Sequence, residues 1–334
     1  MSKIISHEIR LAAHATGMPA AENFSLASVE LAPLVDDQVL VRNLFMSVDP
    51  YMRGRMNPGP SYVPPFGLGQ PLEGGAVGEV LESRSDKFQP GDVVTSNLGW
   101  RECFVAAPAD LRAVSRDVQP LSVYLGVLGM TGMTAWAGLK MAEVKAGDIV
   151  FVSGAAGAVG NVAGQLAKLH GCHVIGSAGS AAKVNFLLEE CGFDRAFDYK
   201  TGPVSELLRE AAPDGIDVYF DNVGGEMLEA ALEALRLHGR IIACGGISGY
   251  NETKPRSGPA NLFNMTTKRL TMKGLIVRDW LDQQDQFARE VGGYFRACRL
   301  KSKETVVSGL DQAVGAFLGL FAGKNVGKMI VKLS

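Results

Sequence analysis

Cysteine is scarce in this 334-residue sequence, and its spacing excludes two classes of protein. The five cysteines are Cys103, Cys172, Cys191, Cys244 and Cys298, and no two of them form a Cys-x-x-Cys pair. A chain this long with so few cysteines does not depend on a disulfide framework. The same spacing excludes the four-cysteine cluster of a structural zinc site.

An excess of charge of either sign is also missing. The 33 Lys and Arg residues nearly balance the 35 Asp and Glu residues, so the formal net charge is −2. This balance gives no electrostatic reason to expect binding to nucleic acid or to an acidic membrane surface. Hydrophobic residues make up 47% of the chain, which is enough for a large buried core.

Membrane-spanning and targeting segments are not expected either. Residues 118–139 and 149–167 are long and uncharged, but both contain several glycines and the first also contains Pro120. They are typical of strand, glycine loop and buried helix in a protein without membrane spans. The first residues have no basic-then-apolar pattern, so we expect a cytoplasmic protein.

A metal site is the last feature that the sequence lacks. The only close pair of histidines is His170 and His173, which are separated by Gly171 and have no carboxylate beside them. Such a pair is a poor set of metal ligands. We therefore predict no bound metal.

Glycine, by contrast, is abundant. It accounts for 40 of the 334 residues, about 12% against a usual ~7%. No G-X-Y period is present, so the chain is not collagen-like. The glycines must serve turns, close backbone packing or a phosphate-binding loop.

The pattern of the chain changes near Pro120. Residues 1–115 carry short apolar segments separated by Pro and Gly turns, which predicts a β-rich region. After Pro120, strand patterns alternate with helical patterns, which predicts a doubly wound parallel sheet. The expected strands are 148–153, 173–177, 195–197, 217–221, 240–244 and 271–277, and the expected helices are 159–170, 181–191, 205–211, 226–237 and 283–297. The final segment, 328–333, is expected to be a strand, but its partner cannot be identified from the pattern.

The most informative segment joins the strand at 148–153 to the following helix. Glycines stand at 154, 157 and 160, directly between a buried apolar strand and a helix with small residues on one face. This arrangement points free backbone N–H groups and the positive end of the helix at a pyrophosphate. The strict G-x-G-x-x-G pattern is not met, because Ala155 replaces its first glycine. We nevertheless predict that Gly157, Ala158, Val159 and Gly160 bind a dinucleotide, although small residues can also serve packing alone.

The next strand end distinguishes between the two nicotinamide cofactors. An NAD site usually has an acidic residue about twenty positions after the glycine loop, where it binds the ribose 2′-hydroxyl. No acid occurs here, and the corresponding stretch contains Gly179, Ser180 and Lys183. A hydroxyl and an ammonium suit a 2′-phosphate, so NADP(H) is the expected cofactor. Lys183 could instead be an ordinary solvated lysine in the first turn of a helix.

Several motifs resemble one family along nearly the whole chain. They are Val41-Arg-Asn-Leu-Phe-Met-Ser-Val-Asp-Pro-Tyr-Met-Arg, Gly129-Met-Thr-Gly-Met-Thr-Ala-Trp, Ala155-Ala-Gly-Ala-Val-Gly, Tyr219-Phe-Asp-Asn-Val-Gly-Gly, Cys244-Gly-Gly-Ile-Ser-Gly-Tyr-Asn and Gly323-Lys-Asn-Val-Gly-Lys. The sequence is similar to the zinc-independent medium-chain dehydrogenase/reductases of the leukotriene B4 dehydrogenase and prostaglandin reductase group, which also includes bacterial NADPH-dependent curcumin reductases. The resemblance implies an α/β protein with three segments: a GroES-like catalytic domain (1–119), a Rossmann cofactor domain (120–304) and a segment that returns to the catalytic domain (305–334).

The resemblance also implies roles for individual residues. Lys183 and Tyr199 would hold the adenosine 2′-phosphate end of NADP(H), and Met130 and Thr131 would lie near the nicotinamide and its ribose. The remaining contacts to the nicotinamide half would come from Asn222, Cys244, Gly245, Gly246, Ile247, Ser248, Tyr250, Leu275, Ile276, Val277 and Asn325. Tyr199 and Asn222 could also be ordinary strand-end residues. Members of the family often carry a tyrosine in the stretch that aligns with residues 262–270, and this chain has none there.

The expected reaction follows from the missing metal ligands. Without a Lewis acid, hydride addition to an electron-poor C=C bond is easier than oxidation of a simple alcohol. Hydride would reach the β-carbon of an enone or enal, and the charge that develops on the carbonyl oxygen would need a hydrogen-bond donor. Tyr250 is the first candidate for this donor and Tyr51 is the second, although either could only pack against the cofactor.

Other functions stay open at this point. A quinone reductase of a neighbouring zinc-free branch is one alternative, and a non-catalytic NADPH-binding protein is another. We expect no nucleic acid or membrane partner. Strand 271–277, placed at the edge of the sheet, could pair with its twin in a second subunit, so a homodimer is expected.

Overall fold

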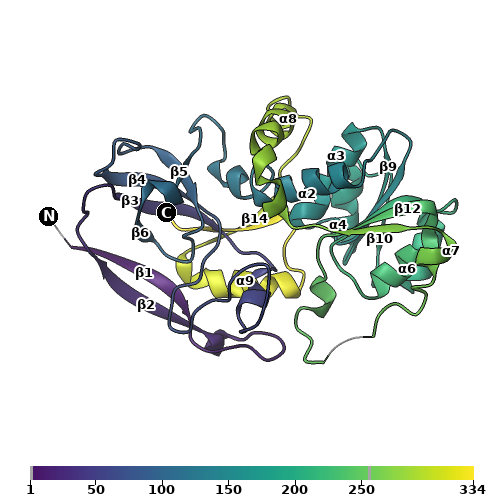
Figure 1. The fold of residues 1–334 in the computed structure, drawn as a ribbon, viewed down its shortest axis with the longest axis horizontal. Helices are drawn as coiled ribbons and strands as arrows, with labels where there is room; N and C mark the ends of the chain where they lie inside the picture. Colours follow the sequence, from purple (N-terminus) through teal and green to yellow (C-terminus); the bar gives the residue numbers. More distant parts are fainter. Residues whose placement is uncertain (1–2, 255–256) are drawn as a thin grey trace. The chain divides into compact units, whose positions relative to one another are not determined.

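The computed structural model describes residues 3–254 and 257–334 and divides them into two units. Unit 1 contains the described residues up to Leu125 together with Glu304–Asn325 and Met329–Ser334. Unit 2 contains the described residues of Gly126–Lys303 together with Val326–Lys328. Figure 1 shows the helices and strands of both units as a ribbon.

Unit 1 is built on antiparallel strands. A two-stranded sheet pairs β1 (Ile4–Leu11) with β2 (Phe24–Leu31). The larger sheet has the order β14-β15-β3-β4-β5-β7, and β6 also pairs with β3. Its members are β3 (Val39–Ser47), β4 (Ala76–Ser83), β5 (Val93–Ser96), β6 (Cys103–Ala106), β7 (Arg112–Ala113), β14 (Glu304–Ser308) and β15 (Lys328–Lys332), and the helices of the unit are α1 (Met52–Arg55) and α9 (Ala313–Phe321).

The C-terminal strand β15 lies beside a strand from the beginning of the chain. It pairs antiparallel with β3 through Ile330 and Ser47 and through Val331 and Met46. Ile330, Val331 and Met46 are fully buried. Pairing over such a long sequence separation cannot be read from local pattern, which explains why the sequence identifies the strand but not its partner.

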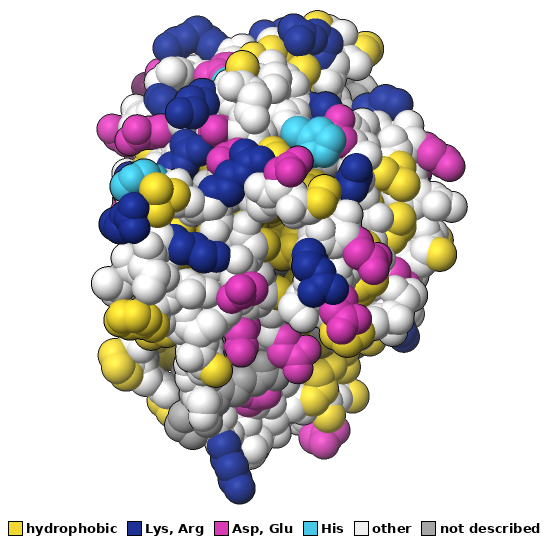
Figure 2. Space-filling view, turned by 90° about the vertical axis from the view of Figure 1, so that its right-hand side faces the viewer, with side chains coloured by type: hydrophobic (Ala, Val, Ile, Leu, Met, Phe, Trp, Pro, Cys, Tyr) yellow, Lys and Arg dark blue, Asp and Glu magenta, His cyan; other side chains and the backbone are white. Residues whose placement is uncertain are grey.

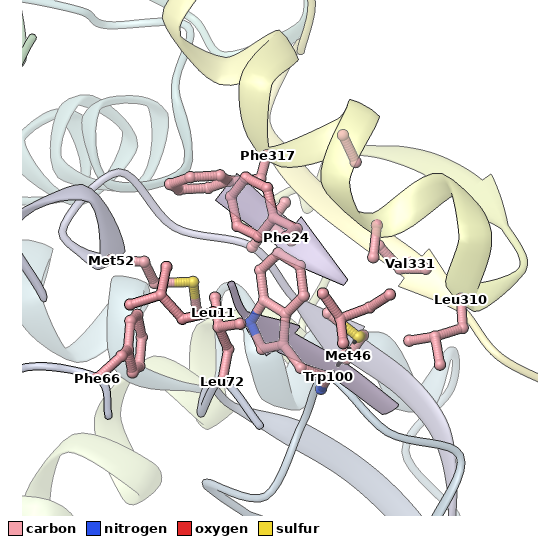
Figure 3. Packing of buried hydrophobic residues seen from close by; sticks show 14 of the residues in the cluster. Leu11, Phe24, Met46, Met52, Phe66, Leu72, Trp100, Leu310, Phe317 and Val331 are labelled. Atoms are coloured by element: carbon pink, nitrogen blue, oxygen red, sulfur yellow. Dashed lines mark hydrogen bonds between the residues drawn. The ribbon is translucent and has the colours of Figure 1, made fainter. Parts of the chain in front are cut away.

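Aromatic side chains fill the core of unit 1 between β1, β2 and α9 (Figure 3). Trp100 is fully buried and stacks on Phe24, with their ring centroids 6.3 Å apart. Phe317 of α9 meets both rings edge-on at 6.1 Å. These edge and stacked arrangements are the ones that aromatic quadrupoles favour. The C-terminal helix therefore belongs to the same core as the N-terminal strands.

Unit 2 is a doubly wound parallel sheet of the Rossmann type. Its strand order is β10-β9-β8-β11-β12-β13, and all neighbouring strands in it are parallel. The strands are β8 (Ile149–Val152), β9 (His173–Ala178), β10 (Arg195–Asp198), β11 (Ile216–Asp221), β12 (Leu235–Ala243) and β13 (Thr271–Gly274). The helices are α2 (Met130–Met141), α3 (Ala158–Leu169), α4 (Ala181–Asn185), α5 (Val204–Ala211), α6 (Glu226–Ala234), α7 (Asn264–Thr267) and α8 (Gln284–Arg296). The fold class predicted from the sequence is confirmed.

Helices cover both faces of this sheet. In Figure 1, α2 and α3 lie above the strands and α6 lies below them. The face toward α5 and α6 buries Phe151, Ile175 and Tyr219 in one cluster. Val150, Phe151 and Val152 are all fully buried, as expected of a central parallel strand that is covered on both sides.

Two elements end earlier than the sequence predicts. The helix expected at 226–237 ends at Ala234, and Leu235 begins β12. The chain then turns tightly, since His238 has a φ of 63° and a Cβ on Gly239 would lie 2.6 Å from a methyl group of Leu235. The strand expected at 271–277 ends at Gly274, and a 3₁₀ helix spans Val277–Gln283.

Within the part of the chain that the structure describes, no helix is long and apolar enough to cross a membrane. Figure 2 views the molecule from the side of unit 2 and shows Lys and Arg side chains mixed with Asp and Glu side chains. This mixture matches the small net charge of the whole chain.

Candidate functional site

The glycine loop between β8 and α3 forms a tight turn in which glycine is favoured at two positions. Gly154 has a φ of 57°, in the left-handed region. A Cβ on Gly160 would lie 2.5 Å from the carbonyl oxygen of Gly154 and 2.8 Å from the Cα of Ala155. Gly160 therefore lets the first turn of α3 pack directly against the loop.

This loop presents unpaired backbone donors at the start of α3. Gly157 is the N-cap of the helix and supplies no side-chain cap. The N–H groups of Ala158, Val159 and Gly160 have no hydrogen-bond partner among residues 3–254 and 257–334. Three such donors at the positive end of a 12-residue helix fit a pyrophosphate.

A second backbone segment lies against the same loop. Gly327 forms an isolated parallel bridge with Gly157, and its N–H donates to the carbonyl of Ala156 at 2.8 Å. Gly327 has a φ of 69°. The sequence places Asn325 in the cofactor site, and Asn325 precedes this bridge by two residues but belongs to unit 1.

Cationic and hydroxyl groups gather at the ends of β9 and β10. Ser180 is the N-cap of α4, and its hydroxyl oxygen accepts a hydrogen bond from the N–H of Lys183. The Tyr199 hydroxyl lies over Gly179, where an added Cβ would approach it to 2.9 Å. Burial, and then the nearby Lys200 ammonium, lower the pKa of Lys183. Two ammonium groups that repel each other beside a helix N-cap form a site that favours an anion.

The ends of β11 and β12 bring the predicted nicotinamide-binding residues together. The Asn222 side-chain amide donates to the carbonyl of Ser153 at 2.8 Å. The N–H groups of Cys244 and Gly245 both donate to the carbonyl of Asp221, at 2.9 and 3.0 Å. Asn222 and the turn that begins at Cys244 are therefore held side by side.

The same ladder of hydrogen bonds continues along the turn. The N–H of Ile247 donates to the carbonyl of Asn222, and the N–H of Ser248 donates to the carbonyl of Val223. The Ser248 hydroxyl donates to this second carbonyl at 2.6 Å. Burial raises the pKa of Cys244 to about 12, so the thiol at the start of the turn stays neutral.

Tyr250 folds back over the glycines of this turn. Its hydroxyl oxygen accepts a hydrogen bond from the N–H of Gly246 at 3.3 Å. Burial raises the pKa of Tyr250 above the ordinary tyrosine value. The hydroxyl thus stays protonated at neutral pH and keeps a proton to donate.

The other predicted contacts of unit 2 lie on neighbouring elements. Leu275 is buried, and its N–H donates to the carbonyl of Ala243, so Leu275, Ile276 and Val277 continue directly from β13. Thr131 is buried in the first turn of α2, and its hydroxyl donates to the carbonyl of Gly126 at 3.0 Å. Met130 begins α2 and is 42% exposed.

Tyr51 belongs to unit 1, where it precedes the short helix α1. Its ring packs against the aromatic core of that unit. Burial, and then the Asp49 carboxylate, raise the pKa of Tyr51 well above its ordinary value. Asp49 in turn accepts a short hydrogen bond from the Ser47 hydroxyl. Tyr51 is therefore a protonated hydroxyl beside a carboxylate.

Two groups in unit 2 were missed by the sequence analysis. Lys200 has no role in the prediction from sequence, although its position next to Tyr199 is a signal for a second cation. The buried set of Ser153, Tyr219 and Asp221 was not assigned any role. An acid at the last position of a central strand, directly before Asn222, is the signal that could have pointed to it. In residues 3–254 and 257–334, no group of three His, Cys, Asp or Glu side chains could hold a metal ion.

Two family models match separate parts of the chain. The N-terminal domain of oxidoreductase matches residues 7–114, and the zinc-binding dehydrogenase model matches residues 158–291. The NADP(+)-dependent 2-alkenal reductase of Nicotiana tabacum is 42% identical over 99% of this chain and 98% of its own length. Prostaglandin reductase 1 of Mus musculus is 42% identical over 96% of both chains.

A solved structure is similar over the same length. CurA from Vibrio vulnificus in complex with NADPH has a TM-score of 0.94 and 36% sequence identity. The match covers 98% of this chain and 99% of CurA. Sequence relatives and solved structure therefore agree over both units.

Proposed function

The chain belongs to the zinc-independent medium-chain dehydrogenase/reductases of the leukotriene B4 dehydrogenase and prostaglandin reductase group, and from this premise we propose that it reduces C=C bonds with NADPH. The substrates are α,β-unsaturated ketones and aldehydes. Two observations carry the proposal. The glycine turn and the neighbouring ammonium groups of Lys183 and Lys200 suit a dinucleotide with a 2′-phosphate, and the chain matches an NADP(+)-dependent 2-alkenal reductase over 99% of its length.

The residues of unit 2 fit the cofactor from end to end. The three free N–H groups at the start of α3 would hold the pyrophosphate, and Ser180, Lys183, Tyr199 and Lys200 would hold the 2′-phosphate. Asn222 and the turn from Cys244 to Tyr250 would hold the nicotinamide. When bound, NADPH supplies a hydride to the electron-poor β-carbon of the substrate.

The protein's own contribution is to stabilise the charge that develops on the substrate oxygen. We place Tyr250 in this role because its hydroxyl is protonated and its oxygen is fixed by the N–H of Gly246. A preorganised donor of this kind acts without reorganisation during the reaction. Tyr51 is the second candidate, because its hydroxyl is also protonated.

The reaction is tested by following NADPH absorbance with a panel of enones, enals and quinones. We expect oxidation of NADPH with enones and enals, and recovery of a product whose C=C bond is saturated and whose carbonyl is intact. Turnover with quinones alone would replace the proposal with a quinone reductase. NADPH binding without turnover on any acceptor would indicate a non-catalytic binding protein.

Replacing Tyr250 with Phe tests the donor. We expect Tyr250→Phe to lower kcat about 100-fold, since one preorganised donor to a developing oxyanion is worth about that much. The matched control is Tyr294→Phe in α8, where the ring lies near Arg299 and not in the turn.

The raised pKa of Tyr250 predicts that the donor form persists above pH 10, so kcat falls only beyond the pH at which an ordinary tyrosine ionises. An unchanged kcat would remove Tyr250 from the mechanism, and Tyr51→Phe would then be tested.

The domain roles form part of the same proposal. Residues 1–119 and 305–334 would make the catalytic domain, and residues 120–304 would make the cofactor domain. The two compact units have similar bounds. Expression of residues 120–304 alone tests this division, since that fragment should fold and bind NADPH without the other residues.

A homodimer is proposed from the edge of the unit 2 sheet. β13 is the last strand of that sheet, and all four of its residues are exposed. An exposed edge strand offers unpaired backbone groups to a second copy across a two-fold axis. Light scattering at micromolar concentration should give twice the chain mass of 35.5 kDa. A mass equal to that of one chain would refute the dimer.

A cytoplasmic location is also proposed. All five cysteines are free thiols, and burial raises the pKa of Cys172 to about 11 and that of Cys191 to about 12. Free thiols throughout are typical of a reducing compartment. Cell fractionation tests this location, and recovery of the protein in a membrane or secreted fraction would contradict it.

A further inference from the structure

A buried polar cluster lies at the end of β11, directly before Asn222. Its members are Ser153, Tyr219 and Asp221, whose exposed fractions are 0%, 0% and 2%. A carboxylate this deeply buried is costly unless it is fully hydrogen-bonded. The resemblance, the relatives and the reaction proposed above give this cluster no role.

Four hydrogen bonds to the Asp221 side chain converge on one atom. Its Oδ1 accepts from the Tyr219 hydroxyl at 2.7 Å and from the Ser153 hydroxyl at 3.3 Å. It also accepts from the N–H groups of Val223 and Gly224, at 2.9 and 2.8 Å. One oxygen thereby fixes the turn that follows Asn222.

The cluster also ties this turn to the glycine loop. The Ser153 hydroxyl oxygen accepts from the N–H of Asn222 at 3.0 Å, and the Ser153 carbonyl accepts from the Asn222 side chain. The backbone carbonyl of Asp221 accepts from Cys244 and Gly245. The ends of three adjacent strands, β8, β11 and β12, therefore meet at Asp221 and its hydrogen-bond partners.

We propose that the Asp221 side chain, supported by the hydroxyls of Tyr219 and Ser153, is a positioning group for the nicotinamide end of NADPH. It holds the N–H groups of Val223 and Gly224 directly and Asn222 through Ser153, and the carbonyls of Asn222 and Val223 in turn hold Ile247 and Ser248 of the turn that begins at Cys244. This inference rests on the proposed function. Tyr219 stays a donor, because burial and the Asp221 charge raise its pKa well above the ordinary value. The cluster acts through its neighbours and does not itself need to touch the cofactor.

The sheet order makes the proposal testable by binding alone. The adenosine end of the cofactor would lie on β9 and β10, whereas Asp221 lies on β11, on the other side of β8. The ligand 2′,5′-ADP carries the adenosine end and lacks the nicotinamide. Loss of the Asp221 carboxylate should therefore weaken NADPH binding and leave 2′,5′-ADP binding in place.

The experiment measures Kd for both ligands by calorimetry on the full chain. For Asp221→Ala we expect the Kd of NADPH to rise about 30-fold and that of 2′,5′-ADP to change less than twofold. Asp221→Asn should restore NADPH binding to within about fivefold of wild type, since its amide oxygen can still accept the bonds that converge on Oδ1. Equal weakening of both ligands, or unchanged NADPH binding in Asp221→Ala, would overturn the proposal.

Two further variants keep the test decisive. Asp217→Ala is the matched control, because Asp217 lies at the opposite end of β11 and accepts from the N–H of Ile149 and from Arg236. It should lower Tm and leave both Kd values unchanged. If Asp221→Ala does not fold, Tyr219→Phe provides the test instead. A rise of about fivefold in the Kd of NADPH, with an unchanged Kd of 2′,5′-ADP, would support the proposal. If both Kd values were unchanged, the proposal would be overturned. Failure of the enone assay with intact NADPH binding would contradict the proposed reaction alone.

Discussion

Replacing Gly160 with Ala should weaken NADPH binding by on the order of 1000-fold and lower the free energy of unfolding by about 1–3 kcal/mol. The added Cβ would lie 2.5 Å from the carbonyl oxygen of Gly154 and 2.8 Å from the Cα of Ala155. Both contacts are with backbone atoms, which cannot rotate away as a side chain can. The start of α3 must therefore move off the loop, and the three donors proposed to hold the pyrophosphate move with it.

The matched control is Gly293→Ala in α8, where an added Cβ meets nothing within 4 Å. Alanine in a helix loses less backbone freedom on folding than glycine, so this variant should be more stable by about 0.4–1 kcal/mol. Calorimetry with NADPH and thermal unfolding measure both effects. If Gly160→Ala bound NADPH as wild type does, the loop could not be the pyrophosphate site. Unchanged stability would show that α3 tolerates the displacement.

The sequence predicts unit 2 well because its signals are local. The strand Ile149–Val152, the glycine loop and α3 follow one another without a break, and each is encoded by its own periodicity. The pairing of β15 with β3 depends on residues nearly 300 positions apart, so no local pattern reveals it. The early end of α6 was missed because Leu235–Leu237 continues the helical pattern, while the tight turn at His238 and Gly239 decides the structure.

For the site, the sequence predicts residue types at strand ends but not the contacts between them. Ser180 was expected to face a phosphate, and the structure adds that it caps α4. The sequence does not predict a role for Asp221, because the four hydrogen-bond donors that converge on its side chain are known only from the structure. Tyr219 belongs to β11, Val223 and Gly224 follow it, and Ser153 directly follows β8, so only the parallel sheet brings these donors together.

Reversing the charge of Lys183 should largely abolish the preference for NADPH over NADH. We expect wild type to favour NADPH in kcat/KM by about 100-fold or more, and Lys183→Glu to lower this preference by on the order of 1000-fold. An ion pair with a phosphate is worth about 1.5–3 kcal/mol, and a like charge in its place adds repulsion. Kinetics with both cofactors and one enone measure the ratio. Equal efficiency of wild type with NADPH and NADH would contradict the predicted cofactor.

Lys87→Glu supplies the control, because it makes the same change in net charge at an exposed position of unit 1. It should leave the ratio of kcat/KM for NADPH to kcat/KM for NADH unchanged.

The pH dependence of cofactor binding gives a second test, since burial and Lys200 lower the pKa of Lys183 in the free protein. The ammonium that attracts the 2′-phosphate is therefore present at neutral pH and is lost as pH rises through this lowered pKa. NADPH affinity should fall in that alkaline range while NADH affinity stays constant, because only NADPH carries the phosphate that the ammonium contacts. A parallel fall for both cofactors would place the titrating group elsewhere.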